Sequence, residues 1–172
     1  GIMCLRNAGI EVIEGVLQEK AAYQNRAYLH RLSTGRPWGI LKWAMSLDGR
    51  IALKSGKSQW ISSLDARRWV HCLRAKCDAV IIGGGTLRMD NPLLTSRGRR
   101  SPEPLRVVLS RSLELPLTSD LWDTTLARTV VAHGPTDKNT NVFDLPVGPE
   151  RLLLRASEPI DLMHALADKG CN

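Results

Sequence analysis

The sequence predicts an α/β fold with a mixed, mostly parallel sheet and flanking helices. Short apolar runs typical of buried strands recur at residues 79–85, 105–110, 129–134 and 151–154. Helical segments or longer connections separate them, and parallel strands need such crossovers. The 172 residues are 43% hydrophobic and 24% charged, which is the balance of a globular protein that buries a substantial core.

The N-terminal segment predicts two helices around a strand. Residues 1–8 are helical in pattern and end at Gly9, and residues 10–16 alternate apolar and polar side chains as a strand does. Residues 17–34 have the apolar spacing of an amphipathic helix.

Gly35-Arg36-Pro37 is typical of a linker, because glycine and proline interrupt regular structure. We therefore expect a domain boundary here, with residues 1–36 forming the end of one unit and its linker, and residues 37–172 forming a second domain.

A hairpin and a helix are expected next. Residues 38–46 and 50–53 predict two strands joined at Asp48-Gly49, and a helix follows over residues 64–78. Ser63 is a suitable N-cap for this helix.

At 100° per residue, the helix over residues 64–78 has two stripes. An apolar stripe that we expect to face a core holds Ala66, Trp69, Val70, Leu73 and Cys77. Arg67, His71 and Arg74 form a second stripe along its border. Arginines at such a border can bind an anion bidentately, and the alternative is a solvated basic face.

The apolar run over residues 79–85 ends in three glycines, and a short helical turn to Asp90 follows. Glycine allows a backbone to approach a phosphate closely. Arg88 stands where the dinucleotide fingerprint needs its last glycine, and no Walker loop is present. The polar residues after the turn favour a ligand-binding edge over a purely structural turn.

The last apolar pattern, over residues 158–170, predicts a helix with Gly170 as its C-terminal cap. A helix of this kind usually leads into another strand, but only Cys171 and Asn172 follow. We therefore expect the chain to be part of a longer protein.

The formal charge of +7 favours an anionic partner. Nucleic acid is disfavoured, because the basic residues form no stripe with aromatic residues, which make up only 5% of the chain. Neither the cysteines nor the histidines have metal-ligand spacing, so no metal site is expected. No segment predicts a membrane span or a signal peptide, so the cytoplasm is the default compartment and a plastid the alternative.

Two residues of the hairpin region are unusual. Lys42 lies in an otherwise apolar predicted strand, which indicates an ion pair, a charged ligand or a side chain that reaches solvent. Trp60 follows a loop of small residues and predicts either a core residue or an aromatic wall beside a heterocycle. Motifs of classical catalysts are absent from the sequence, which fits chemistry carried by a cofactor.

The stretches "LKWAMSLDGRIALKSGKSQWISS", "ARRWVHCLRAKCDAVIIGGGTLRMDNPLLTSRG" and "PLRVVLS" are ordered and spaced as in one family. Over residues 37–172 the chain closely resembles the reductase domain of the bifunctional riboflavin-biosynthesis deaminase/reductase. The resemblance implies a dihydrofolate-reductase-like fold that is incomplete at the C-terminus. Residues 1–36 resemble the tail of the preceding deaminase domain without its zinc-binding motifs, so this chain is expected neither to bind zinc nor to deaminate.

The resemblance implies an NADPH-dependent oxidoreductase that reduces 5-amino-6-(5-phosphoribosylamino)uracil to 5-amino-6-(5-phosphoribitylamino)uracil by hydride transfer to ribose C1′. Carried over by motif, the residues expected to contact NADPH are Ala44, Trp60, Thr86 and Asp90. Those expected to contact the substrate are Lys42, Ser58, Ser62, Arg74, Leu94 and Arg97. No residue is assigned as the catalytic acid or base.

The resemblance has two departures. Relatives usually read "VLDS" where this chain has "VLSRS", so the cofactor contact of that serine is open between Ser110, Arg111 and Ser112. Relatives also continue into a segment with an acidic substrate contact and a glycine-rich phosphate loop. The resemblance therefore implies that this chain holds part of a site, which leaves its activity alone open, and that the full-length protein is a homodimer with a linked deaminase domain.

Two alternatives remain open at this stage. One is a dihydrofolate-reductase-like reductase of another pterin or pyrimidine, which would not require Ser58, Arg74 and Arg97 for a phosphate. The other is a catalytically silent ligand-binding domain.

Overall fold

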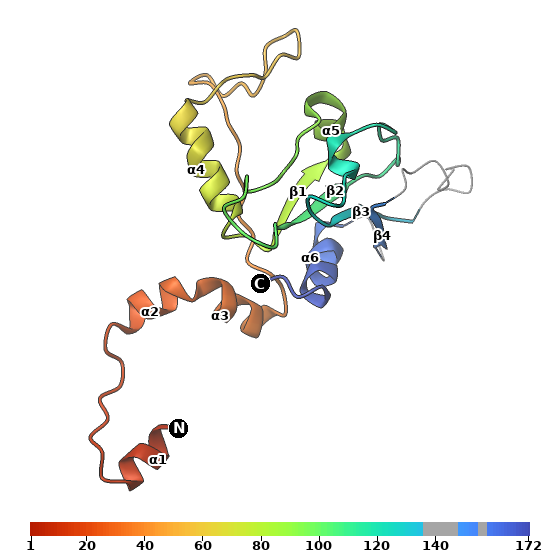
Figure 1. The fold of residues 1–172 in the computed structure, drawn as a ribbon. Helices are drawn as coiled ribbons and strands as arrows, with labels where there is room; N and C mark the ends of the chain where they lie inside the picture. The colour runs from red at the N-terminus through yellow and green to blue at the C-terminus, as the bar shows by residue number, and fades with distance from the viewer. Residues whose placement is uncertain (136–147, 155–157) are drawn as a thin grey trace.

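The computed structural model describes residues 1–135, 148–154 and 158–172. Its centre is a sheet of four parallel strands in the order β1-β2-β3-β4, which confirms the α/β fold (Figure 1). The strands are β1 (Ala79–Gly83), β2 (Leu105–Leu109), β3 (Thr129–His133) and β4 (Glu150–Leu153). Each strand lies where an apolar run predicts one, because side chains buried on both faces of a parallel sheet give continuous apolar sequence.

Apolar side chains cover both faces of the sheet. On one face Val108 packs with α5 (Gly84–Asp90) and the 3-10 helix η1 (Asp120–Trp122). On the other face Val107 packs with α6 (Pro159–Asp168). Neighbouring strand residues point to opposite faces, so the two valines anchor two separate clusters. The sheet is therefore the middle of three layers.

The helix α6 follows its prediction closely. Pro159 lies in its first turn, and Gly170 after its end has a φ of +88° and donates its N–H to the carbonyl of Ala167 at 2.9 Å. Leu162 and Leu166 are buried against the sheet. None of the helices in the described ranges is long and apolar enough to cross a bilayer.

Helix α4 (Leu64–Arg74) begins as predicted, since the Ser63 hydroxyl accepts a hydrogen bond from the N–H of Ala66 at 3.2 Å. It ends before residue 78. The N–H groups of Lys76 and Cys77 bond to carbonyls three residues back, which tightens the last turn into 3-10 geometry.

The predicted orientation of α4 is wrong. No residue of this helix is buried, and Trp69 of the expected core stripe is 60% exposed. Arg67, His71 and Arg74 are half-buried, and so are Val70, Leu73 and Cys77 of the apolar stripe, so the two stripes are covered to a similar degree. Helical periodicity shows which residues share a face, but what covers that face depends on distant parts of the chain.

The predicted hairpin strands over residues 38–46 and 50–53 are also wrong. Only turn hydrogen bonds form there, such as Ser46 N–H to the Arg50 carbonyl at 2.8 Å. In Figure 1 this part of the chain runs up past α4 and projects beyond the sheet. A strand needs a neighbour to pair its backbone groups, and no described strand lies beside these residues.

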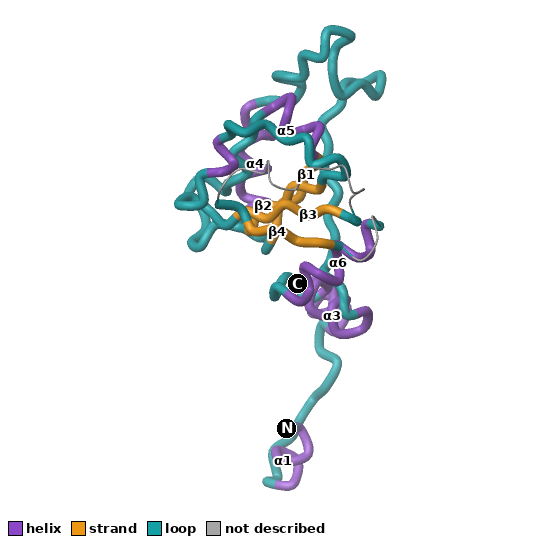
Figure 2. Tube along the Cα trace, turned by 90° about the vertical axis from the view of Figure 1, so that its right-hand side faces the viewer, coloured by secondary structure: helices purple, strands orange, loops and turns teal. Residues whose placement is uncertain are grey.

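The N-terminal helices are α1 (Ile2–Asn7), α2 (Gln18–Gln24) and α3 (Arg26–Thr34). The single helix predicted over residues 17–34 is interrupted at Asn25, which has a φ of −96° and a ψ of 15°. The strand predicted over residues 10–16 is absent for the same reason as the hairpin strands. Figures 1 and 2 both show α1 far from the sheet, with α3 beside the end of α6.

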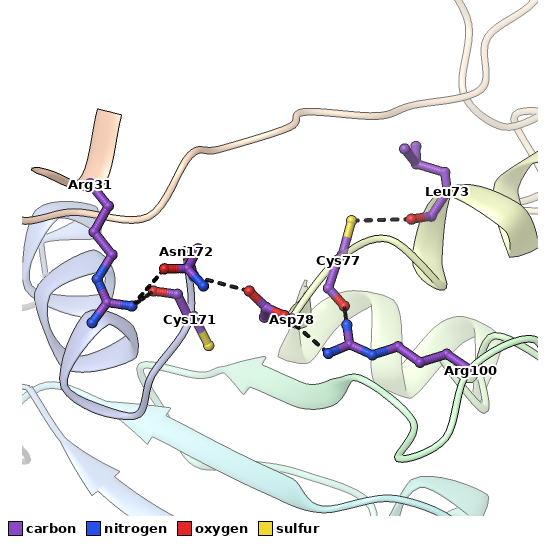
Figure 3. A network of polar contacts seen from close by, with 7 residues as sticks. All are labelled: Arg31, Leu73, Cys77, Asp78, Arg100, Cys171 and Asn172. Atoms are coloured by element: carbon purple, nitrogen blue, oxygen red, sulfur yellow. Dashed lines mark hydrogen bonds and ion pairs between the residues drawn. The ribbon is translucent and has the colours of Figure 1, made fainter. Parts of the chain in front are cut away.

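A polar network connects α3 to the start of the sheet (Figure 3). Arg31 donates to the carbonyls of Ala167, at 2.8 Å, and of Cys171 just after α6. The N–H of Asn172 donates to Asp78 at 3.0 Å, and Arg100 pairs with the same carboxylate at 3.1 Å. Asp78 directly precedes β1, so the network joins three segments that are distant in sequence.

Candidate active site

The three glycines lie at the junction of β1 and α5. Gly84 is buried, and a Cβ built on it would lie 3.0 Å from Leu115 Cδ2 and 3.1 Å from Ser110 Oγ. A larger residue would therefore push α5 away from the loop after β2. Close packing accounts for this glycine without a phosphate.

Ser110 is itself part of this packing. It is buried, and its hydroxyl accepts a hydrogen bond from the N–H of Leu113 at 3.2 Å. Arg111 and Ser112 are exposed. Of the three residues that could make the predicted cofactor contact, only Arg111 and Ser112 have accessible side chains.

Helix α5 presents two of the predicted cofactor residues to solvent. Thr86 and Asp90 are exposed and stand four residues apart, so they share one face of the helix. The hydroxyl of Ser58 donates to Asp90 Oδ1 at 3.4 Å. The structure therefore brings a predicted substrate residue, Ser58, against a predicted cofactor residue.

Trp60 forms a second part of the site. Its ring is 68% exposed, and the guanidinium of Arg67 lies 4.2 Å from the ring centroid. Arg67 Nη1 also donates to the carbonyl of Ser62 at 2.7 Å. Arg67 thus holds Trp60 and Ser62 beside the N-terminus of α4, a cation–π arrangement that the sequence did not show.

Ser58 and Trp60 line a cavity of ≈ 190 Å³ together with the turns between Ser46 and Lys57. A larger cavity of ≈ 500 Å³ lies between α3 and the end of α6, and none of the predicted site residues lines it. We place the candidate site by the grouping of polar and aromatic side chains around the smaller cavity, because the larger one holds none of the predicted residues.

Replacing Arg67 with alanine should release Trp60. We expect the resonance of Trp60 to shift in the fluorine NMR spectrum of fluorotryptophan-labelled protein, because the cation leaves the ring face. The matched control is Arg68→Ala on the same helix, since among the described residues Arg68 forms its ion pair with Asp65, at 3.1 Å. An unmoved resonance in Arg67→Ala would show that the two groups do not stack in solution.

Arg74 and Arg97 form the third part of the site. Arg74 Nη1 donates to the carbonyl of Thr95 at 3.3 Å. Burial, followed by the nearby charge of Arg97, lowers the pKa of Arg74. No ion pair compensates either arginine within the described part of the chain. Two close cations without a carboxylate favour an anion between them.

The loop that carries Arg97 has an uncommon backbone. Leu94 and Arg97 both have a φ of +57°, and Asn91 has a φ of +40°. Side-chain-bearing residues rarely adopt the left-handed region, and such conformations cluster at functional sites. Leu94 is only 2% exposed and packs in the core, so its backbone is what a ligand can reach.

Lys42 and Ala44 remain apart from these groups. Lys42 is exposed, and no hydrogen bond or ion pair joins it to another described residue. The predicted cost of a charge in an apolar strand therefore does not arise, because the segment is not a strand. Ala44 is half-buried in the same segment.

No group of three or more histidine, cysteine, aspartate or glutamate residues among the described ones could hold a metal ion. The candidate site therefore consists of a tryptophan held by Arg67, a polar contact on α5 and an arginine pair.

A parallel sheet flanked by helices, with polar groups gathered around the helix that follows β1, defines an α/β domain, which the family match and the similar solved structures make one of the dihydrofolate-reductase-like kind. The model of the RibD C-terminal domain family matches residues 37–172. The chain belongs to this family.

Relatives in several organisms support the assignment. The chain is 48% identical over 172 residues to "Riboflavin biosynthesis protein RibD" of Synechocystis, covering 99% of this chain and 47% of the relative. It is 42% identical over 137 residues to the chloroplastic "Riboflavin biosynthesis protein PYRR" of Arabidopsis thaliana, covering 74% of this chain and 23% of the relative. The chain thus spans about half the length of the RibD relatives or less.

Solved structures agree. A deaminase and 5-amino-6-(5-phosphoribosylamino)uracil reductase from Thermotoga maritima has a TM-score of 0.82 at 30% identity, over 99% of this chain and 47% of that one. Acinetobacter baumannii RibD has a TM-score of 0.76 at 34% identity, over 98% of this chain and 47% of that one.

Proposed function

We propose that this protein is the reductase part of a riboflavin-biosynthesis enzyme that reduces 5-amino-6-(5-phosphoribosylamino)uracil with NADPH. The observation that carries the proposal is the half-buried Arg74, which has no ion pair in the described part of the chain and donates to the Thr95 carbonyl in the loop that carries Arg97, in a domain of the RibD family. The names of the relatives and of the Thermotoga maritima structure support this reaction.

The arginine pair accounts for a phosphorylated substrate. A phosphate monoester is close to a dianion at neutral pH, and arginine matches its oxygens through a planar fork of donors. A pterin without a phosphate would leave Arg74 and Arg97 with unopposed charges. Ser58 and the backbone of the Leu94–Arg97 loop supply donors and acceptors for the rest of the substrate.

The residues around Trp60 fit a nicotinamide cofactor. An exposed indole ring held from one side by Arg67 leaves its other side for a flat heterocycle. Trp60, Thr86 and Asp90 would hold NADPH, and Ala44 would approach it from the preceding segment. NADPH supplies a hydride, which the proposed reaction adds at ribose C1′ to open the sugar into a ribityl chain.

The proposed place of the protein also follows its relatives. A linked deaminase domain is proposed from the name of the Thermotoga maritima structure. A homodimer of the full-length protein is proposed from the family resemblance of the sequence alone. The compartment is proposed to be the cytoplasm, or a plastid, since the two plant relatives are named chloroplastic.

Trp60→Ala is expected to weaken NADPH binding by about ten- to a hundredfold, because stacking of an aromatic base on a side chain contributes about 1–3 kcal/mol. The measurement is an NADPH titration of the full-length protein, followed by quenching of the remaining tryptophans. Trp43→Ala is the matched control, since Trp43 is 56% exposed in the same segment and has no predicted role.

Wild type and Trp43→Ala should quench alike, and NADH should bind weakly. An equal loss of NADPH affinity in Trp60→Ala and Trp43→Ala would show that Trp60 does not contact the cofactor. Absence of NADPH binding by the wild-type full-length protein would overturn the proposed reductase.

A further inference from the structure

The loop that carries Arg97 is held by a carboxylate of the chain itself. Glu103 accepts a hydrogen bond from the N–H of Ser96 through Oε2 at 2.5 Å, and another from the N–H of Gly98 through Oε1 at 2.9 Å. Ser96 and Gly98 are the immediate neighbours of Arg97 in the sequence. One side chain therefore fixes the backbone on both sides of a predicted substrate residue.

The shape of this turn explains why it takes up a carboxylate. Arg97 has a φ of +57° and Gly98 a φ of +73°, so two successive residues lie in the left-handed region. Successive N–H groups in such a turn converge and form a concavity that binds anions. Each oxygen of the Glu103 carboxylate takes one N–H group of this concavity. The turn is therefore an anion site that the protein fills from within.

Glu103 is a rigid support, because the residues that follow it belong to the frame of the sheet. Pro104 is fully buried. The N–H of Leu105, the first residue of β2, donates to the carbonyl of Asp78 at 2.9 Å. The carboxylate therefore reaches the loop from a fixed position.

The loop needs such a support. The side chain of Ser96 is fully buried, and its hydroxyl accepts a hydrogen bond from the N–H of Arg100 at 3.1 Å, whereas Arg97 is exposed. The left-handed conformation is unfavourable for arginine, because its Cβ crowds the following carbonyl oxygen. A residue persists in this conformation only where its surroundings impose it, and the two bonds to Glu103 do so here.

The Glu103 carboxylate is ionised at neutral pH. Burial raises the pKa of this carboxyl, but the hydrogen bonds that it accepts and the charge of Arg100 outweigh the effect of burial and hold the pKa below its ordinary value. A charged acceptor makes both hydrogen bonds stronger than neutral ones would be. Glutamine has a single acceptor oxygen and no charge, so it could replace the carboxylate only in part.

We infer that Glu103 is a positioning residue, whose carboxylate holds the turn over residues 96–98 in the conformation that presents Arg97 to the substrate. The role of Arg97 rests on the proposed function, and Glu103 would act through Arg97 without touching the ligand itself. Loss of the carboxylate should therefore weaken substrate binding, while the cofactor contacts around Trp60 remain.

The test compares Glu103→Ala and Glu103→Gln in the full-length protein by steady-state kinetics. Glu103→Ala should raise the KM for 5-amino-6-(5-phosphoribosylamino)uracil about tenfold, because a charged contact to the ligand is misplaced. The kcat and the dissociation constant of NADPH should stay nearly unchanged. Glu103→Gln should lie between Glu103→Ala and wild type, and it carries the same comparisons if the alanine variant does not fold.

A double variant separates positioning from a merely structural role. Two residues that act through one contact are not additive, so Glu103→Ala should raise the KM no further once Arg97 is replaced by alanine. Glu150→Ala is the matched control, because Glu150 is also a half-buried carboxylate and accepts hydrogen bonds from Arg128 and Lys169. Glu150→Ala should lower the free energy of unfolding and leave the KM unchanged.

Limited digestion with trypsin follows the same loop without any enzymatic activity. Trypsin cleaves after arginine where the backbone can open, and the rate follows the population of the open form. Cleavage after Arg97, identified by mass spectrometry of the fragments, should be about tenfold faster in Glu103→Ala than in wild type or Glu150→Ala.

The outcomes separate this role of Glu103 from the proposed function. An additive loss in the double variant, or equal rates of cleavage after Arg97 in all three proteins, would overturn the inference. Glu103-dependent cleavage in a protein without reductase activity would support the hold of Glu103 on the loop and reject the reaction. Reductase activity with a KM that Glu103→Ala leaves unchanged would support the reaction and reject the inference.

Discussion

Arg74→Ala is expected to raise the KM for 5-amino-6-(5-phosphoribosylamino)uracil by about a hundredfold and to leave NADPH binding nearly unchanged. Removing one charged partner from a half-buried anion site typically costs about 2–5 kcal/mol, because the rest of the site loses its match to the ligand. Arg74 also holds the carbonyl of Thr95, so its loss loosens the strained loop that carries Arg97. Steady-state kinetics with the full-length protein measure the effect.

Two comparisons make this result specific. Arg68→Ala on the exposed side of α4 should leave both ligands unaffected. Arg74→Lys should recover part of the loss, since a point charge replaces a planar fork. The decisive comparison uses the substrate without its phosphate, for which Arg74→Ala should cost little. An equal loss with and without the phosphate would contradict the assignment of Arg74.

Leu87→Ala is expected to lower the free energy of unfolding by about 2–5 kcal/mol, the usual range for a leucine removed from a packed core. Leu87 is fully buried on α5 and packs with Val108 and Leu121 against one face of the sheet. Its contacts fix the helix that carries Thr86 and Asp90. Urea unfolding followed by circular dichroism measures the change, and NADPH affinity should fall with it.

Met89→Ala on the same helix is the control, because Met89 is 70% exposed and should change stability little. A Leu87→Ala protein as stable as wild type would mean that α5 does not depend on this core contact. Contacts other than those of Leu87 would then fix the positions of Thr86 and Asp90.

The strands were predictable because each is a short apolar run, which is the sequence pattern of a parallel strand covered on both faces. The run "LRVVL" in β2 places Val107 on one face of the sheet and Val108 on the other, so both faces need a covering layer. The segment over residues 38–53 also carries apolar runs, but no strand in the described part of the chain pairs with it. Pairing depends on which distant backbone lies beside a segment, and local pattern contains no information about that.

The site was predictable in its components and less so in its contacts. The stripe of Arg67, His71 and Arg74 could be drawn from spacing alone, since residues three and four apart share a helix face. That Arg67 lies on the Trp60 ring, and that Arg74 bonds to the Thr95 carbonyl, depends on how two loops approach α4.

The hydrogen bonds of Arg31 bear on how this domain can be handled as a unit. The family match begins at residue 37, but Arg31 donates to carbonyls at the end of α6, on the far side of that position. A protein shortened to start at Pro37 would leave those acceptors to water and break the chain of contacts to Asp78 and β1. The smallest portable unit for grafting, fusion or circular permutation therefore starts with α3 rather than with the linker.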